Sequence, residues 1–221
     1  MSLFKKISLY FICVLLFQVN AFDPIQKFIS EYKELRIQKL DYSNAFTYGA
    51  QDPTLTIIEF YDYLCPYCSD VSNQLLEFAK TNKNSVKMVF MNFPLDQKCN
   101  KMVSKDIHPG ACELSYAAYC ANDQQKFIDF HEKLFELQMY YNVVTHEKIL
   151  KLVESMKLDK TKFNTCMTSE KTAKFITNQI NIAEKNNIEF TPTVFINGKK
   201  LKTIPDNHTL TGLLQHESFK E

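Results

Sequence analysis

Two cysteines separated by two residues are the part of the sequence best suited to chemistry. Cys65 and Cys68 enclose Pro66 and Tyr67, after an apolar run and before a segment with helical spacing. Such a pair can close a disulfide, and the free amides at the start of a helix stabilise a thiolate on its first cysteine. A redox dithiol is therefore predicted, with Cys65 as nucleophile and Cys68 as resolving cysteine. By itself, the pair could also be half of a zinc site or two packed thiols.

The segments around the dithiol predict a β-α-β unit. Residues 54–61 are rich in β-branched and aromatic side chains, as in a strand covered on both faces. Residues 69–82 have helical spacing, and residues 86–93 form a second apolar run. This order places the dithiol at the carboxyl end of the first strand, where open α/β sheets carry their active sites.

Beyond residue 99 the pattern changes to helices alone, up to about residue 185. Helical spacing or a helix start signal is found at 111–121, 124–137, 145–156, 160–166 and 170–185. A strand at 193–196 then returns through the Asn197-Gly198 pair, a strong hairpin signal, into residues 199–203. A short helix at 209–217 closes the sequence.

The first 21 residues have the pattern of a secretory signal peptide. Lys5 and Lys6 precede an apolar run from Ile7 to Val19, and small or branched residues lead to Ala21, after which we expect cleavage. The alternative is an uncleaved membrane anchor, which needs about 20 apolar residues. An exported chain and a periplasmic location are therefore predicted.

Residues 22–47 predict a short helix and a linker. Asp23-Pro24 resembles an N-cap followed by proline in the first helical position, and apolar side chains recur to Leu35. A polar stretch, residues 41–53, follows. The apolar stripe either packs on the main domain or serves as an oligomerisation arm, and we favour a monomer because so short a stripe rarely assembles alone.

The charge balance and the cysteine count bound the functional class. Without Lys5 and Lys6 the chain has 24 basic and 25 acidic side chains, a net charge of −1, which predicts no attraction to nucleic acid. Cys13 lies in the signal peptide, so six of the seven cysteines remain. An even number in an exported chain indicates disulfides and an oxidising compartment.

Three segments in this order resemble the DsbA-like branch of the thioredoxin superfamily: residues 59–68, residues 92–121 with their three cysteines, and residues 190–199. The middle segment is particularly similar to thioredoxin-like domains linked to bacterial vitamin K epoxide reductase homologues. The resemblance implies an α/β fold, a thioredoxin fold with an inserted all-helical domain. Residues 48–98 and 186–221 would form the thioredoxin fold, and residues 99–185 the insertion.

The resemblance also implies how a substrate is held. Pro192 would be cis and lie beside Cys65, leaving the backbone of Thr191 free to pair with a substrate strand. An ordinary trans proline at a strand start is the alternative. Pro66 and Tyr67, between the cysteines, are assigned to the same substrate-binding surface.

Glu59 matches a position at which the family has a buried acid beneath the dithiol. A carboxyl group in a strand interior would hold its proton more tightly and could accept a proton from Cys68 during exchange. Alternatively, its side chain faces solvent or pairs with a lysine, because the strand is too apolar for alternation to be followed.

The other four cysteines are expected to be structural. Cys99 and Cys112 lie in the segment that carries the resemblance, around a loop whose closure would stabilise the fold by about 3 kcal/mol. Cys120 and Cys166 are then left to pair, although packed free thiols are also consistent with the sequence. A second exchange-active pair at Cys99 and Cys112 is a further alternative.

The function predicted from these features is that of a thiol:disulfide oxidoreductase introducing disulfides into exported proteins. Its partners would be folding proteins with cysteines and a membrane quinone-linked reoxidant, DsbB-like or vitamin K epoxide reductase-like. We expect no metal and no cofactor other than the redox-active disulfide. The alternatives are a periplasmic reductase or isomerase, and a thiolate copper-binding protein that uses Met88, Met91 or a histidine.

Overall fold

A five-stranded mixed sheet lies at the centre of the computed structural model, which describes residues 23–140 and 144–219. Its strands are β1 (Phe46–Gly49), β2 (Leu55–Tyr61), β3 (Val86–Asn92), β4 (Thr193–Ile196) and β5 (Lys199–Lys200). Their order across the sheet is β1-β3-β2-β4-β5. β2 and β3 are parallel, and the other neighbours are antiparallel. The predicted signal peptide lies outside the described residues.

The two parallel strands are covered on both faces, as their composition predicts. Leu55, Ile57 and Tyr61 of β2 belong to one buried cluster, and Ile58 and Phe60 belong to another on the opposite face. The crossover between β2 and β3 is the helix α3 (Pro66–Thr81), which packs on the first face with its own buried side chains. The predicted β-α-β unit is present, and it sets the dithiol at the carboxyl end of β2.

Helix α3 begins three residues earlier than the spacing predicts. Cys65 occupies the N-cap position and Pro66 the first helical position, where the fixed φ of proline suits a helix and its missing amide is not needed. Cys68 therefore lies within the first turn of the helix.

The polar stretch at residues 41–53, which begins in the predicted linker, contains the edge strand β1. Phe46 pairs with Phe90 and Gly49 with Lys87 in an antiparallel ladder against β3. Four residues are too few for a periodic signal, and the strand forms because β3 offers it an unpaired edge. The boundary drawn between the linker and the thioredoxin fold at residue 48 divides this strand.

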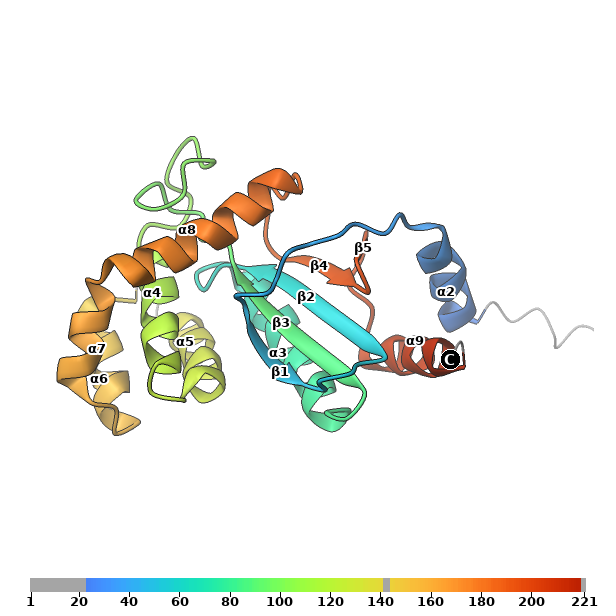
Figure 1. Ribbon diagram of the computed structural model, residues 1–221, viewed down its shortest axis with the longest axis horizontal. Helices are drawn as coiled ribbons and strands as arrows, with labels where there is room; N and C mark the ends of the chain where they lie inside the picture. Colours follow the sequence, from blue (N-terminus) through green and yellow to red (C-terminus); the bar gives the residue numbers. More distant parts are fainter. Residues whose placement is uncertain (1–22, 141–143, 220–221) are drawn as a thin grey trace, which may run out of the picture.

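Five helices follow β3: α4 (Ala111–Asn122), α5 (Phe127–Tyr140), α6 (His146–Ser155), α7 (Lys160–Met167) and α8 (Glu170–Lys185). Figure 1 shows α4–α7 gathered at one end of the sheet, with α8 running from them back across it. Ile176, Ile180 and Ala183 of α8 are buried in the cluster on the second face of the sheet.

Two helix predictions in this region need correction. Residues 99–110 form a loop of turns rather than the start of a helical region. α5 begins at Phe127 rather than at residue 124, because Gln125 has a φ of 59° and the amide of Lys126 turns back to the carbonyl of Ala121. A residue in the left-handed region ends one helix before the next can begin.

The helices α2 (Pro24–Glu34) and α9 (Asn207–Ser218) pack together at the other end of the sheet (Figure 1). Asp23 caps α2 by accepting a hydrogen bond from the amide of Ile25. Ile29 and Tyr32 of α2 are buried in the main core, and the Tyr32 hydroxyl donates to the carbonyl of Ile196 in β4. The apolar stripe of α2 is thus covered by the chain itself. Within the described residues, no helix has the length and apolar character that crossing a bilayer requires.

Candidate active site

The dithiol lies at the turn from β2 to α3, and the backbone fixes both sulfur atoms there. The amide of Cys65 donates to the carbonyl of Asp62 at 3.1 Å, and the amide of Cys68 donates to the carbonyl of Cys65 at 3.1 Å. Both cysteines are free thiols in the structure, and Cys65 is 5% exposed whereas Cys68 is fully buried. The pair therefore presents one sulfur atom, Cys65 Sγ, toward the surface.

The environment of Cys65 favours its thiolate. The Cys68 thiol beside it, contacts from Thr191 and the backbone of Cys68 together lower the pKa of Cys65 to about 6, against the opposing effects of burial and of Asp62. Cys65 is therefore largely ionised at neutral pH, which is the state a nucleophilic cysteine requires.

The environment of Cys68 has the opposite effect. Burial has the largest effect, and the neighbouring Cys65 and Glu59 add to it. Together they raise the pKa of Cys68 far above its ordinary range. The reduced dithiol therefore holds one thiolate and one thiol. This asymmetry gives the two cysteines different chemical roles.

The loop before β4 completes the surface around Cys65. The Thr191–Pro192 peptide bond is cis, and Cys65 Sγ lies 3.5 Å from the carbonyl oxygen of Thr191. Tyr67 is 75% exposed and Phe190 is 59% exposed, so the segments that flank the thiolate carry two exposed aromatic side chains. The structure thus places the loop with Thr191 and Pro192 beside the β2–α3 turn, where α3 begins with Pro66 and Tyr67, and the role of these four residues in binding a substrate stays a prediction.

Glu59 is fully buried in β2, on the sheet face that α3 covers. Neither of its carboxyl oxygens has a hydrogen-bond partner of good geometry within the described residues. Burial raises the pKa of Glu59 to about 8, the nearby Ser72 hydroxyl opposes this shift, and the charge of Cys65 adds to it. Glu59 is therefore protonated at neutral pH, and its charge interacts with those of both cysteines, while its role in proton exchange with Cys68 stays a prediction.

A buried histidine lies behind this acid. His131 of α5 is hydrogen-bonded through Nε2 to the Ser72 hydroxyl at 2.9 Å and through Nδ1 to the Tyr63 hydroxyl at 2.7 Å. Burial lowers the pKa of His131 to about 3, so the ring is neutral. These two hydrogen bonds connect the helical insertion to α3 and to the segment between β2 and Cys65.

The other cysteines form two disulfides. Cys99 is bonded to Cys112, with an S–S distance of 2.02 Å, and this bond closes the loop that precedes α4. Cys120 of α4 is bonded to Cys166 of α7 at 2.04 Å. Both pairs join segments outside the β2–α3 turn.

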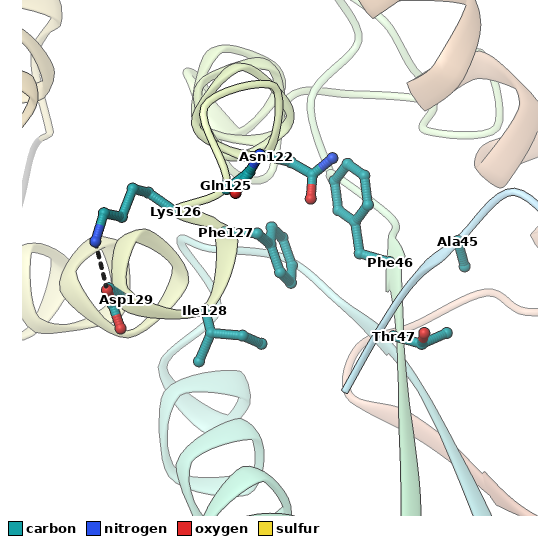
Figure 2. A pocket seen from close by; sticks show the side chains of 9 residues that line it. All are labelled: Ala45, Phe46, Thr47, Asn122, Gln125, Lys126, Phe127, Ile128 and Asp129. Atoms are coloured by element: carbon teal, nitrogen blue, oxygen red, sulfur yellow. Dashed lines mark ion pairs between the residues drawn. The ribbon is translucent and has the colours of Figure 1, made fainter. Parts of the chain in front are cut away.

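The open pocket in Figure 2 is not part of this site. It lies between β1 and the connection from α4 to α5, with Phe46 and Phe127 facing each other at a centroid distance of 4.6 Å. An ion pair between Lys126 and Asp129 lies at its rim. None of the predicted site residues lines it.

The copper-binding alternative finds little support in the arrangement of ligands. Met88 and Met91 lie on opposite faces of β3, in separate buried clusters. In the part of the chain that the structure describes, no three His, Cys, Asp or Glu side chains are grouped as metal ligands.

The sequence model of the family described as Thioredoxin matches residues 41–216. The chain belongs to the thioredoxin family. This thioredoxin-family chain is 26% identical over 175 residues to disulfide bond formation protein D of Bacillus subtilis, covering 76% of the chain and 75% of that protein. It also matches Na+/H+ antiporter NhaA 3 of Salinispora tropica, 26% identical over 152 residues, and spans only 21% of the length of that antiporter.

Solved structures agree with this family fold. BdbD from Bacillus subtilis in its oxidised form has a TM-score of 0.67 at 24% identity, over 83% of this chain and 97% of that one. Wolbachia pipientis alpha-DsbA1 has a TM-score of 0.65 at 20% identity, over 82% and 94%. The predicted thioredoxin fold of the DsbA type is confirmed.

Four residues around this site are not singled out by the sequence analysis, although Asp62 and His108 lie in segments that carry the resemblance: Asp62, Ser72, His108 and His131. Ser72 follows Cys68 by four positions and so shares its face of α3, which is the one pattern that could have suggested it. Both histidines come from segments far along the chain, and only the fold brings them to the dithiol.

Proposed function

We propose that the protein is an exported thiol:disulfide oxidoreductase that introduces disulfides into other exported proteins. The observation that carries the proposal is the asymmetry of the dithiol: a Cys65 thiolate that keeps a small exposed area and a fully buried Cys68 thiol, with Glu59 alongside. Stabilising the thiolate favours the reduced form, and this makes the disulfide form an oxidant.

The exchange balances as follows. A substrate thiolate attacks Cys65 Sγ of the Cys65–Cys68 disulfide, the S–S bond breaks, and Cys68 leaves and takes a proton, for which protonated Glu59 is the nearest source. A second substrate thiolate then attacks the substrate sulfur atom of the mixed disulfide, and Cys65 leaves as a stable thiolate. The substrate loses two electrons, and the dithiol gains them.

Supporting features extend the proposal to substrate and partner. Thr191, Pro192, Pro66 and Tyr67 lie around Cys65, where the backbone of an extended substrate segment would pair. A membrane quinone-linked enzyme is the proposed reoxidant, because the dithiol must return its electrons and is proposed as the sole redox group. Periplasmic location rests on the signal-peptide pattern of residues 1–21.

The test is the reduction potential of the Cys65–Cys68 pair, measured against glutathione by alkylation and mass spectrometry, together with oxidation of a reduced, unfolded substrate. We expect a potential of roughly −120 to −150 mV and stoichiometric oxidation of the substrate. A potential near −220 mV or below, with reduction or isomerisation of disulfides instead, would assign the protein to the reductases or isomerases.

Two variants show which cysteine reacts first. Cys68→Ser is expected to accumulate mixed disulfides with the substrate through Cys65, whereas Cys65→Ser is expected to form none. The reverse pattern would contradict the assignment of the nucleophile.

A further inference from the structure

The loop of residues 93–112, here called the stapled loop, folds back onto the active-site turn. The carbonyl of Leu95 accepts hydrogen bonds from the amides of Ile107 and His108 at 3.2 and 2.9 Å. The Cys99–Cys112 disulfide closes the loop, and Asp96 accepts from the amide of Gly110 at 2.8 Å. These contacts fix the position of His108 relative to the sheet.

His108 contacts the buried acid of the active-site turn. Its Nδ1 lies 2.9 Å from Oδ2 of Asp62, a side chain that is fully buried, while His108 itself is 20% exposed. The carboxylate of Asp62 also accepts from the amides of Leu64 and Leu95 at 2.6 and 2.7 Å. Asp62 therefore joins three segments: the turn before Cys65, the end of β3 and the stapled loop.

The charges of these groups act on one another. The negative charge of Asp62 raises the pKa of Cys65, because it repels a thiolate. The pKa of His108 is raised mainly by Asp62 and further by Cys65, because both favour the imidazolium, while burial opposes the shift. Within the stapled loop the other carboxylates, Asp96 and Asp106, are bonded to backbone amides of that loop.

Interaction between charges is reciprocal, so a thiolate that favours the imidazolium is itself favoured by it. We propose that His108 is a positioning residue of the dithiol, whose cationic form offsets the charge of Asp62 and so stabilises the Cys65 thiolate. The proposal deepens the proposed function, on which it rests, by naming a source of oxidising strength outside the Cys65–Cys68 segment.

The test separates two effects of residue 108 on Cys65, namely its positive charge and its hydrogen bond to Asp62. In His108→Gln the hydrogen bond to Asp62 is retained without the charge, and in His108→Lys the charge is retained. We expect His108→Gln to raise the pKa of Cys65 by up to about one unit, the low end of the range for a nearby opposite charge. The glutathione equilibrium should move toward the disulfide form by up to about tenfold, at a factor of ten per pKa unit.

His108→Lys is expected to restore most of the wild-type value. His146→Gln is the matched control, because His146 also pairs with a carboxylate, Glu113 at 2.6 Å, but on the exposed surface. It should leave Cys65 unchanged. Equal Cys65 pKa values in wild type, His108→Gln and His146→Gln would overturn the proposal, as would a folded His108→Lys variant that behaves like His108→Gln.

The pH dependence gives a readout that a purely structural role would not change. His108 is cationic below its raised pKa and neutral above it, so the difference between wild type and His108→Gln should disappear as pH rises through that pKa. His108→Lys should show no such loss over the same interval. A difference that persists unchanged into alkaline pH would contradict a charge effect.

A measurement on the unaltered protein guards against variants that fail to fold. NMR titration of the His108 ring should give a higher pKa in the reduced protein than in the oxidised protein, because only the reduced form carries the thiolate. Identical values in the two forms would overturn the inference. Cys65 ionisation, followed by thiolate absorbance, needs no substrate, so failure here is distinguishable from failure of the proposed oxidase activity.

Discussion

At the scale of single residues, this protein gives two chemically identical side chains very different acidities. Cys65 and Cys68 differ because one meets hydrogen-bond donors at a helix start and the other is buried beside an acid. Glu59 is that acid, and it is held protonated by burial rather than by a partner. Burying an ionisable group disfavours its charged form, so Glu59 and His131 should each make the stability of the fold depend on pH.

Replacing Glu59 with glutamine should stabilise the oxidised protein at alkaline pH. The folded chain holds the proton of Glu59 more tightly than the unfolded chain, so wild-type stability falls as pH rises from the ordinary value of 4.5 to about 8. Glutamine has no proton to lose, and the gain should reach roughly 2–5 kcal/mol at about 1.4 kcal/mol per pKa unit.

Urea unfolding at a series of pH values measures this effect. Glu31→Gln is the control, because the side chain of Glu31 is 64% exposed and pairs only at 3.8 Å with Lys27. A gain for Glu59→Gln that does not grow with pH would show that Glu59 is not the titrating group.

His131 should make the fold sensitive to acid. Its folded pKa lies near 3, below the ordinary 6.5, so the unfolded chain binds a proton that the folded chain does not, and stability is lost as pH falls through this interval. His131→Gln should flatten this part of the stability profile, at a cost near neutral pH of about 1–3 kcal/mol for the disturbed hydrogen bonds to Ser72 and Tyr63.

Equilibrium unfolding between mildly acidic and neutral pH checks the slope. His208→Gln, in an exposed position of α9, should keep the wild-type slope. If His131→Gln keeps it as well, another group is responsible for the loss in acid.

At the scale of elements, the two disulfides act on different structures. Cys99–Cys112 closes a loop without regular structure over a separation of 13 residues, whereas Cys120–Cys166 joins α4 to α7 over a separation of 46. Their contributions to stability should therefore differ mainly through the length of chain that each constrains.

Removing the longer crosslink should cost more. By chain entropy, Cys120→Ser/Cys166→Ser should lose about 4 kcal/mol and Cys99→Ser/Cys112→Ser about 3 kcal/mol, because a longer closed loop restricts the unfolded chain more. Denaturant unfolding of both double variants, with the dithiol kept in one redox state, tests this order. A larger loss from the shorter crosslink would mean that the stapled loop contributes native contacts beyond its closure.

At the scale of the whole molecule, a thioredoxin-type sheet is flanked at one end by a helical insertion and at the other by α2 and α9 (Figure 1). The insertion supplies His131 beneath the dithiol, and the stapled loop supplies His108 beside it. The opposite end is closed by packing between the first and last described helices, where Ile25 lies against Gly212. The candidate active site and the contact between α2 and α9 thus lie at different ends of one core.

This arrangement predicts that α2 stabilises the chain without assembling it. Ile29 is 5% exposed, and Ile29→Ala should lower the free energy of unfolding by roughly 2–4 kcal/mol through lost packing, while the mass in solution stays that of a monomer. Denaturant unfolding and sedimentation measure the two effects, with exposed Gln26→Ala as the control. A wild-type dimer that dissociates in the Ile29→Ala variant would instead support the alternative in which α2 is an oligomerisation arm.

The sequence by itself determined the parts of this protein that depend on neighbours along the chain. The spacing of Cys65 and Cys68, the apolar run before them and the cap of α2 are local features, since helix starts and strand periodicity depend on nearby residues. Glu59 matches the position of the family's buried acid, but the residues around it left open whether its side chain is buried, because an almost wholly apolar strand hides its alternation.

Only the tertiary structure decided what surrounds the dithiol. His131 lies 59 residues from Ser72, and His108 lies 46 residues from Asp62. No short pattern relates residues so far apart. The edge strand β1 was missed for a similar reason, because four residues form it only where β3 offers free backbone groups. The acidity of each cysteine is set by the neighbouring cysteine, by burial and, for Cys65, by Thr191 from the loop before β4, and the chain acquires this burial and this contact only when it is folded.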